Sequence, residues 1–250
     1  MIKLILCGSS GKMGRAVTKS IASFCDVRIA AGIDSKTCGN DCFPVFNTPG
    51  KVNIDADAII DFSNPELIDP LLNYSLYKKL PMVVCTTGFS DSQIAKIKKA
   101  ATSIPIFFSG NMSIGINLLI ELSKKAAEVL CDSFDIEIVE KHHNQKIDAP
   151  SGTALMIANA INSDTGNKYN YVYDRHSYRK KRMPKELGIH SVRGGTIVGE
   201  HEVIFAGNNE VLTLSHSAQS KEVFAVGAIN AARFIVRQKP GLYNMSDLLK

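Results

Sequence analysis

Residues 140–154 carry the densest group of side chains that could do chemistry. Two adjacent histidines, His142 and His143, are followed by Lys146. A histidine can act as a general acid near neutral pH, and a lysine can neutralise a carboxylate or deliver a proton. Residues 151–153 (Ser-Gly-Thr) then begin a helical pattern, where backbone N–H groups can bind an anion. The segment therefore pairs a proton donor with a cradle for a carboxylate.

Simpler roles for the same residues stay open. Ser151 or Asp148 could be an ordinary helix N-cap. The histidine pair could bind a metal, but no third ligand stands at helical or hairpin spacing, so we predict no metal site. Ser151 is not part of a G-x-S-x-G turn, which disfavours a nucleophilic serine.

A glycine-rich segment, Gly8-Ser9-Ser10-Gly11-Lys12-Met13-Gly14, lies between a predicted strand and a predicted helix. Glycines in this position allow a tight turn and let a pyrophosphate approach the helix start. Asp34 follows the last glycine by 20 residues, at the end of the second predicted strand, where a carboxylate can bind ribose hydroxyls. Lys36 could pair with a 2′-phosphate instead. We therefore predict NADH or NADPH binding, with a preference within roughly tenfold, and a purely structural turn as the alternative.

Strand and helix patterns alternate along the first part of the chain, which predicts a Rossmann-like, doubly wound α/β domain with a parallel sheet. The expected strands cover residues 3–7, 27–33, 56–62, 81–86 and 104–108, and the expected helices cover 13–21, 66–79 and 91–101.

After residue 112 the pattern changes to a second α+β domain with a mainly antiparallel sheet. Gly207-Asn208-Asn209 is typical of a hairpin turn, and residues 164–188 show no period and are expected to form a long loop. We assign residues 1–112 and 223–250 to dinucleotide binding, and 113–222 to substrate binding and oligomerisation. Helices are expected at 116–130, 153–162 and 223–238, and strands at 134–140, 189–192, 196–205 and 210–217.

The composition is that of an ordinary globular protein. Of 250 residues, 45% are hydrophobic and 21% are charged, and the net charge of +5 is too small to indicate nucleic-acid binding. No apolar run reaches the ~18 residues of a membrane span, and the start does not resemble a signal peptide. We expect a soluble cytoplasmic protein that has no membrane or nucleic-acid partner and whose six cysteines are reduced.

Several motifs together resemble one known family, the 4-hydroxy-tetrahydrodipicolinate (dihydrodipicolinate) reductases of lysine and diaminopimelate biosynthesis. The resemblance covers nearly the whole chain, and its most specific part is the stretch from His142 to Thr153. It rests on Gly8-x-x-Gly11-Lys12-Met13-Gly14, Thr86-Thr87-Gly88-Phe89, Gly110-Asn111-Met112-Ser113-x-Gly115-x-Asn117, Glu140-x-His142-His143-x-x-Lys146-x-Asp148-Ala149-Pro150-Ser151-Gly152-Thr153-Ala154, Arg193-Gly194-Gly195-x-x-x-Gly199-Glu200-His201 and Gly241-Leu242-Tyr243-x-Met245-x-Asp247-Leu248.

The resemblance implies hydride transfer from a nicotinamide to C4 of a cyclic unsaturated imine dicarboxylate, with a proton added at C3. It implies that His142 donates this proton with support from Lys146, and that the protein is a homotetramer built through the sheet of the second domain. His143, Lys146, Ser151, Gly152 and Thr153 would hold the substrate carboxylates. The cofactor would bind Gly8, Gly11, Lys12, Met13, Gly14, Asp34, Lys36, Phe62, Cys85, Thr86, Thr87, Gly88, Gly110, Asn111 and Met112.

Two other functions compete with this one. Another two-domain NAD(P)-dependent dehydrogenase, acting on a sugar or a semialdehyde, would share the glycine-rich turn but has no need for the residues between His142 and Thr153. A non-enzymatic regulator that senses the cofactor would be expected to lose the ionisable residues of the second site, and this chain keeps them.

Overall fold

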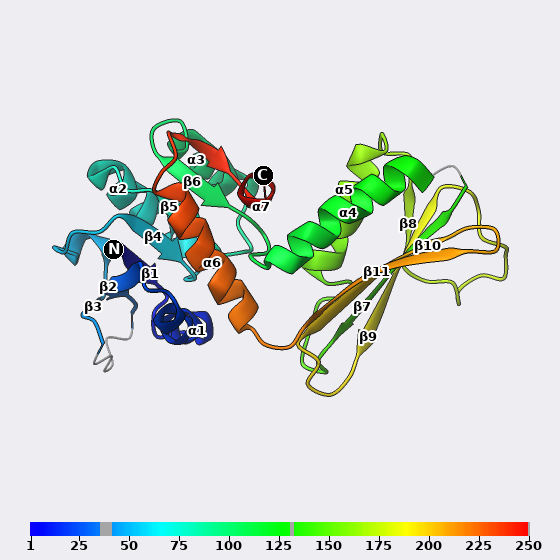
Figure 1. Ribbon diagram of the computed structural model, residues 1–250, viewed down its shortest axis with the longest axis horizontal. Coiled ribbons are helices and arrows are strands. Elements are labelled where there is room, and N and C mark those ends of the chain that lie inside the picture. Colours follow the sequence, from blue (N-terminus) through cyan, green and yellow to red (C-terminus); the bar gives the residue numbers. More distant parts are fainter. Residues whose placement is uncertain (36–41, 131–132, 250) are drawn as a thin grey trace. The chain divides into compact units, whose positions relative to one another are not determined.

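The computed structural model of the protein describes residues 1–35, 42–130 and 133–249. The chain divides into two compact units, one formed by Met1–Ile114 with Lys221–Lys250 and the other by Gly115–Ser220 (Figure 1). The first holds a parallel sheet and the second a mixed sheet, which confirms the predicted fold class.

The first unit is built on a seven-stranded sheet in the order β12-β6-β5-β4-β1-β2-β3, and every pairing in it is parallel. Its strands are short, nearly continuous apolar runs because both faces of the sheet are covered. The strands are β1 (Ile2–Cys7), β2 (Val27–Ile33), β3 (Val45–Phe46), β4 (Ala58–Asp61), β5 (Met82–Val84), β6 (Pro105–Phe108) and β12 (Gly241–Tyr243).

The helices of this unit cover opposite faces of the sheet, as residues of β1 show. Leu4 and Leu6 pack with α1 and α6, whereas Ile5 and Cys7 pack with α2 and α3. Helix α6 comes from the end of the chain and belongs to this unit. The helices are α1 (Lys12–Ser20), α2 (Ile68–Lys78), α3 (Asp91–Ala100), α6 (Glu222–Ile235) and α7 (Met245–Leu248), with short 3₁₀ turns at Ile21–Ser23, Pro49–Lys51 and Pro65–Leu67.

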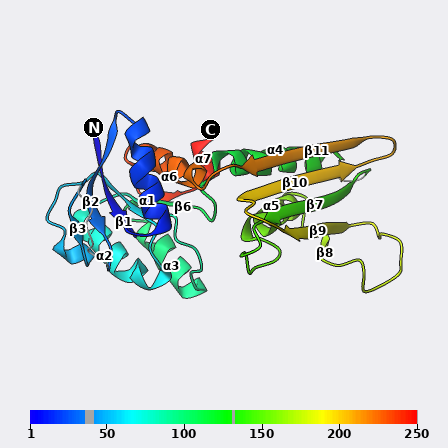
Figure 2. The same ribbon diagram turned by 90° about the horizontal axis from the view of Figure 1, so that it is seen from below.

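The second unit is a five-stranded sheet in the order β11-β10-β7-β9-β8 (Figure 2). The pairings of β10 with β11 and β7 are antiparallel, and those of β9 with β7 and β8 are parallel. Helices α4 (Ile114–Leu130) and α5 (Gly152–Asp164) share one apolar core with this sheet. The strands are β7 (Asp135–His142), β8 (Asn170–Val172), β9 (Glu186–Arg193), β10 (Gly199–Ala206) and β11 (Val211–Ala218).

The sequence-based boundaries hold for most elements, and the predicted hairpin at 207–209 joins β10 to β11. The expectation of one long loop at 164–188 is wrong, because β8 lies inside it and β9 begins at Glu186. Strand β8 has only three residues and is held by its parallel pairing with β9, which no local pattern reveals. In the same segment, the guanidinium of Arg182 pairs with Glu137 and Asp135.

Among the described residues no helix is long and apolar enough to cross a membrane. Cys7 and Cys85 are buried and Cys25 and Cys42 are exposed, and within the described residues these four cysteines form no disulfide. Cys38 and Cys131 lie outside the described residues.

Gly227 gives a test of how α6 packs in the first unit. A Cβ at this position would overlap the carbonyl oxygen of Met112. We expect Gly227→Ala to lower the free energy of unfolding by about 1–3 kcal/mol, although alanine is the better helix former. Urea unfolding measures the change, and Gly50→Ala is the control because nothing lies within 4 Å of its added Cβ. Unchanged stability in Gly227→Ala would contradict this packing.

Candidate active site

The cofactor residues predicted from the sequence lie at one edge of the parallel sheet. Because all of its strands run in the same direction, the loops after them emerge together at the carboxyl edge, the usual place for ligands in this fold. The glycine-rich turn follows β1, Asp34 follows β2, Phe62 follows β4, residues 85–88 follow β5, and residues 110–112 follow β6.

The three positions of the turn carry glycine for different physical reasons. Gly8 has a φ of +73°, and a Cβ there would overlap the carbonyl oxygen of Phe62; a Cβ on Gly14 would overlap that of Gly8. Gly11 is the N-cap of α1, where no side chain caps the helix, and its added Cβ would meet only the Gly8 oxygen at 3.2 Å. The N–H groups at the start of α1 therefore have no side-chain acceptor at the N-cap and fit the phosphates of a dinucleotide.

Asp34 is tied to the same turn. Its Oδ2 accepts a hydrogen bond from the backbone N–H of Ser10 at 2.9 Å. The carboxylate thus fixes the turn while standing at the end of β2, where a ribose would lie. Lys36, the residue predicted to favour a 2′-phosphate, is outside the described residues.

The later loops offer mainly backbone to a cofactor. The Met112 side chain is buried in the core beside α6, so only the backbone of this residue could contact a cofactor. Asn111 holds its turn by accepting a hydrogen bond from Ser113 N–H at 2.8 Å. Burial raises the pKa of the Cys85 thiol well above its usual value, and the neighbouring Asp61 raises it further, which keeps the thiol neutral.

The second group of predicted residues clusters at the end of β7. Alternation along this strand places Ile136, Ile138, Glu140 and His142 on its buried face. The Nδ1 atom of His142 lies 2.6 Å from the Glu140 Oε2. The side chain of Glu140 is fully buried, so its charge must be met inside the protein.

Arg193 of β9 meets that charge with two parallel hydrogen bonds. Its two terminal nitrogens donate to the two Glu140 oxygens at 2.8 and 2.7 Å, and the Ser151 N–H donates to the same carboxylate at 3.1 Å. Burial by itself raises the pKa of Glu140, but the hydrogen bonds from Arg193, Ser191, His142 and Ser151 outweigh it and lower that pKa to about 2. Glu140 is therefore ionised at neutral pH.

The surroundings of His142 favour its neutral form. Burial lowers its pKa, Lys146 and Arg193 lower it further, and Glu140 opposes them. His201 packs edge-on against it, with ring centroids 5.3 Å apart. Burial, followed by the nearby His142, lowers the pKa of His201 to about 4.

Some of the groups that could bind an anion in this cluster already have partners within the protein. The Lys146 ammonium lies 2.8 Å from Asp148 Oδ1. Ser151 gives its N–H to Glu140, and its hydroxyl accepts from Ala154 N–H and contacts His201 Nε2 at 3.2 Å. Ser151 thus acts as the N-cap of α5.

His143 has a buried Nδ1 atom with no hydrogen-bond partner among the described residues. A buried imidazole nitrogen normally has one, so this atom is available to a ligand or water. Together with Lys146 it makes the surroundings of His142 suited to an anionic ligand.

Sequence reasoning did not assign roles to Glu140, Arg193 and His201, although all three stand in the quoted motifs. Glu140 could have been found from its spacing, because residues two apart on a strand share a face. The other two reach the site only through the pairing of β9 and β10 with β7.

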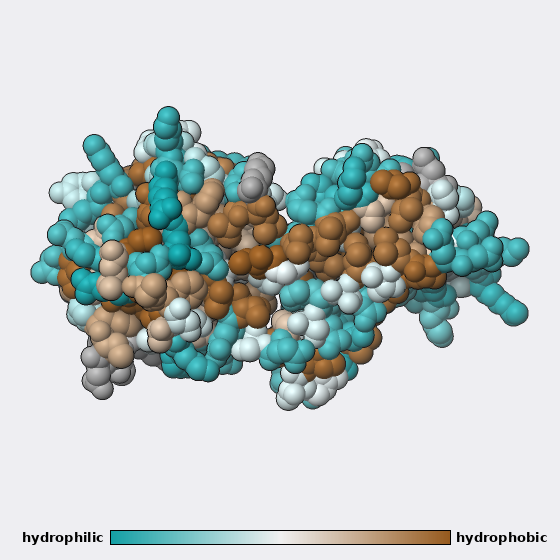
Figure 3. Space-filling view, in the orientation of Figure 1, coloured by the Kyte–Doolittle hydropathy of each residue, from teal (hydrophilic) through white to brown (hydrophobic). Residues whose placement is uncertain are grey.

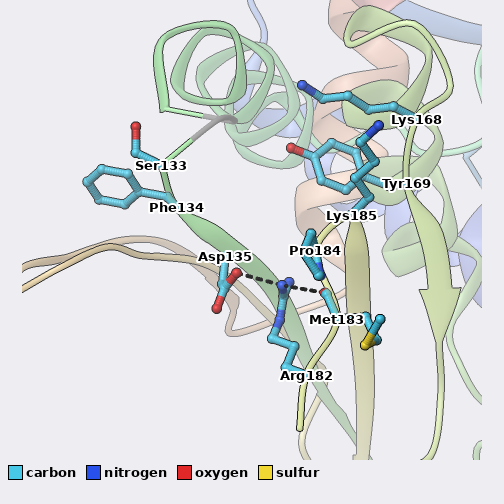
Figure 4. Close-up of a pocket in the computed structure, with 9 residues that line it drawn as sticks. All are labelled: Ser133, Phe134, Asp135, Lys168, Tyr169, Arg182, Met183, Pro184 and Lys185. Atoms are coloured by element: carbon cyan, nitrogen blue, oxygen red, sulfur yellow. Dashed lines mark hydrogen bonds and ion pairs between the residues drawn. The ribbon is translucent and has the colours of Figure 1, made fainter.

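A further pocket of about 380 Å³ lies at the opposite end of β7 (Figure 4). Arg182 and Asp135 pair across it. Its lining shares no residue with the His142 cluster: Ser133, Phe134, Asp135, Lys168, Tyr169, Arg182, Met183, Pro184 and Lys185. Within the described part of the chain, no three His, Cys, Asp or Glu residues are grouped to hold a metal.

The doubly wound unit with its uncapped helix start, and the second unit with its histidine and lysine cluster, define the class of two-domain nicotinamide-nucleotide oxidoreductases. The chain belongs to the dihydrodipicolinate reductase family. The N-terminal region of that family matches residues 2–112 and the C-terminal region matches residues 115–249. The family recognised from the motifs is thereby confirmed, and with it an enzyme that uses NADH or NADPH.

Individual relatives agree with this assignment. The chain is 54% identical to the 4-hydroxy-tetrahydrodipicolinate reductase of Caldanaerobacter subterraneus subsp. tengcongensis, covering 100% of this chain and 99% of the relative. It is 46% identical to that of Clostridium tetani, covering 100% and 97%. A dipicolinate-bound dihydrodipicolinate reductase from Paenisporosarcina sp. TG-14 superposes with a TM-score of 0.82 at 25% identity, covering 98% and 97%. An amine dehydrogenase from Mycobacterium smegmatis shares the fold alone, with a TM-score of 0.68 and 12% identity.

Gly11 gives a test of the cofactor turn. A valine there keeps an accessible backbone conformation but fills the space before the start of α1, so we expect weaker binding of NADH and NADPH without loss of folding. Nucleotide titration measures the affinity and thermal unfolding checks the fold, with Gly50→Val as the control variant. Normal binding of both nucleotides to Gly11→Val would show that the turn is not the phosphate site.

Proposed function

We propose that this enzyme acts on 4-hydroxy-tetrahydrodipicolinate, which loses its 4-hydroxyl group as water to give the unsaturated ring of dihydrodipicolinate. The enzyme reduces this ring to tetrahydrodipicolinate by hydride addition at C4 and proton donation at C3 by His142. The observation that carries the proposal is the position of His142, beside the Lys146 ammonium and the start of α5 in one cluster. The relative from Paenisporosarcina binds dipicolinate, an aromatic dicarboxylate of the same size as the substrate.

In this proposal the first unit holds the nucleotide. The start of α1 binds the pyrophosphate, and Asp34 faces the adenosine ribose. Phe62, residues 85–88 and residues 110–112 line the edge where the nicotinamide lies. When bound, the nicotinamide supplies the hydride. We propose that both NADH and NADPH are accepted.

The charge of the substrate controls the proton in this proposal. Two carboxylates beside His142 favour its charged form and raise its pKa, which opposes the effects of burial, Lys146 and Arg193. His142 then carries a proton when the substrate is bound and can deliver it to the ring carbon. Lys146 holds one carboxylate, which joins or replaces Asp148 as its partner. His143, Gly152 and Thr153 complete the carboxylate contacts.

Kinetics of His142→Gln and Lys146→Ala test these roles. We expect His142→Gln to lower kcat by about 10²- to 10⁴-fold with a smaller change in KM, because it removes the acid. Lys146→Ala lowers kcat and also raises KM, because ground-state binding is lost. Cofactor affinity is nearly unchanged in both variants.

The controls are His176→Gln, at an exposed loop position, and Lys98→Ala, on the exposed side of α3. Both should behave like the wild type. A His142→Gln enzyme with near wild-type kcat would remove this histidine from the mechanism, and His143 would be tested next.

We further propose a homotetramer, as is typical of the family. On the second sheet, Val203 and Phe205 share a core with α4 and α5 within the chain. Exposed apolar residues on this unit include Val211 and Leu212 on β11 and Leu118, Leu122 and Val129 on α4, where Figure 3 shows a hydrophobic band. Such a surface indicates association.

Light scattering measures the assembly directly. We expect a mass about four times the 27.2 kDa of one chain at micromolar concentration. A mass equal to one chain would contradict the tetramer, whatever the catalytic results.

A further inference from the structure

The acceptor sites of Glu140 are all directed at named donors. Oε1 accepts from Ser151 N–H and one Arg193 nitrogen, and Oε2 accepts from the other Arg193 nitrogen and faces His142 Nδ1. The Ser191 side chain, on β9, is a further donor to this carboxylate. These donors come from β9, from the start of α5 and from β7 itself. The arrangement makes Glu140 a fixed, ionised acceptor at the back of the His142 ring.

An ionised carboxylate has no proton to donate, so the hydrogen between Glu140 and His142 belongs to Nδ1. We infer that Glu140, clamped by Arg193, is the positioning residue that fixes the tautomer of His142 and leaves Nε2 as the only atom that exchanges the catalytic proton. The inference rests on the proposed function, in which His142 is the proton donor.

The surroundings of Nε2 agree with this assignment. A Cβ added to Gly199 of β10 would lie 3.1 Å from His142 Nε2, so a side chain at this position would crowd that atom. The glycine therefore helps to leave space beside Nε2.

The charged and titratable groups that face His142 come from four segments. Glu140 is on β7, Arg193 on β9, His201 on β10, and Lys146 on the loop after β7. Of these, Glu140 alone favours the protonated imidazole, and the two cations oppose it. Loss of the Glu140 charge therefore lowers the pKa of His142, so that the protonated imidazole loses its proton at a lower pH.

The clamp also has a purely structural interpretation, because Arg193 joins Glu140 to the Asp148 carbonyl and so holds the loop after β7. A structural role would change stability, but it would not select one imidazole nitrogen or move a kinetic pH profile. The two roles are therefore separable by measurement.

The first experiment uses the wild-type protein. Nitrogen-15 NMR of labelled histidines, assigned by loss of the signal in His142→Gln, reports which ring nitrogen carries the proton. At a pH above the titration of His142, we expect Nδ1 to be protonated and Nε2 to be bare. Protonation of Nε2 in the neutral ring would overturn the inference, and the result does not depend on the folding of any Glu140 variant.

The second experiment compares Glu140→Gln with Glu137→Gln. A glutamine at 140 has one acceptor oxygen for Arg193 and presents N–H groups to Nδ1, so it favours the opposite tautomer. We expect kcat to fall by at least about tenfold, up to the loss seen in His142→Gln, and the high-pH limb of kcat/KM to move to lower pH. Glu137 is the matched control: it also pairs with arginines and a histidine, but on the other face of β7.

The outcomes separate the inference from the proposed function. If His142→Gln is inactive while Glu140→Gln keeps the wild-type kcat and pH profile, the donor stands and the positioning role is wrong. If His142→Gln is fully active, the proposed donor is wrong even where NMR finds the Nδ1–H tautomer. An equal loss in Glu137→Gln would show that any lost charge on β7 disturbs the enzyme, and would also overturn the inference.

Discussion

A fully buried carboxylate stays ionised only when donors fill its oxygens, and the geometry of the second unit depends on how Glu140 meets this requirement. Arg193 neutralises its charge, Ser151 ties it to the start of α5, and His142 takes the remaining direction. Breaking such a buried pair costs about 3–5 kcal/mol, so the donors are held firmly in place. The positions of the imidazole, the N-cap serine and the loop between them follow from one electrostatic constraint.

The same constraint explains why the His142 imidazole favours its neutral form. Glu140 is balanced by Arg193, and Lys146 is held near Asp148, which leaves His142 with no net anionic neighbour. Burial then keeps the imidazole neutral. An anionic ligand changes this balance, so its binding is thermodynamically coupled to uptake of a proton. In the proposed function, the dicarboxylate substrate thereby completes the acid that reduces it.

The first unit obeys a geometric constraint instead. Parallel strands deliver their following loops to one edge, so residues far apart in sequence, from Gly8 to Asn111, meet there without any special contact between them. The physical role of each residue at this edge is nevertheless different. Gly8 and Gly14 are required by close approach of backbone, whereas Gly11 leaves space before a helix start. Met112, included among cofactor residues by its place in a motif, keeps its side chain in the core.

The sequence by itself determined the alternating strands and helices, the turn before α1, the hairpin after β10 and the cluster of His142, His143 and Lys146, because periodicity and turn chemistry are local. Only the tertiary structure decided the short strand β8, the pairing of Arg182 with Glu137, and the occupation of the Ser151 N–H by Glu140. It also decided that Arg193 and His201 reach His142, since they are brought there by strand register across more than 50 residues of chain. Contacts of this kind depend on which strands are neighbours in the sheet, and no local pattern in one sequence encodes that choice.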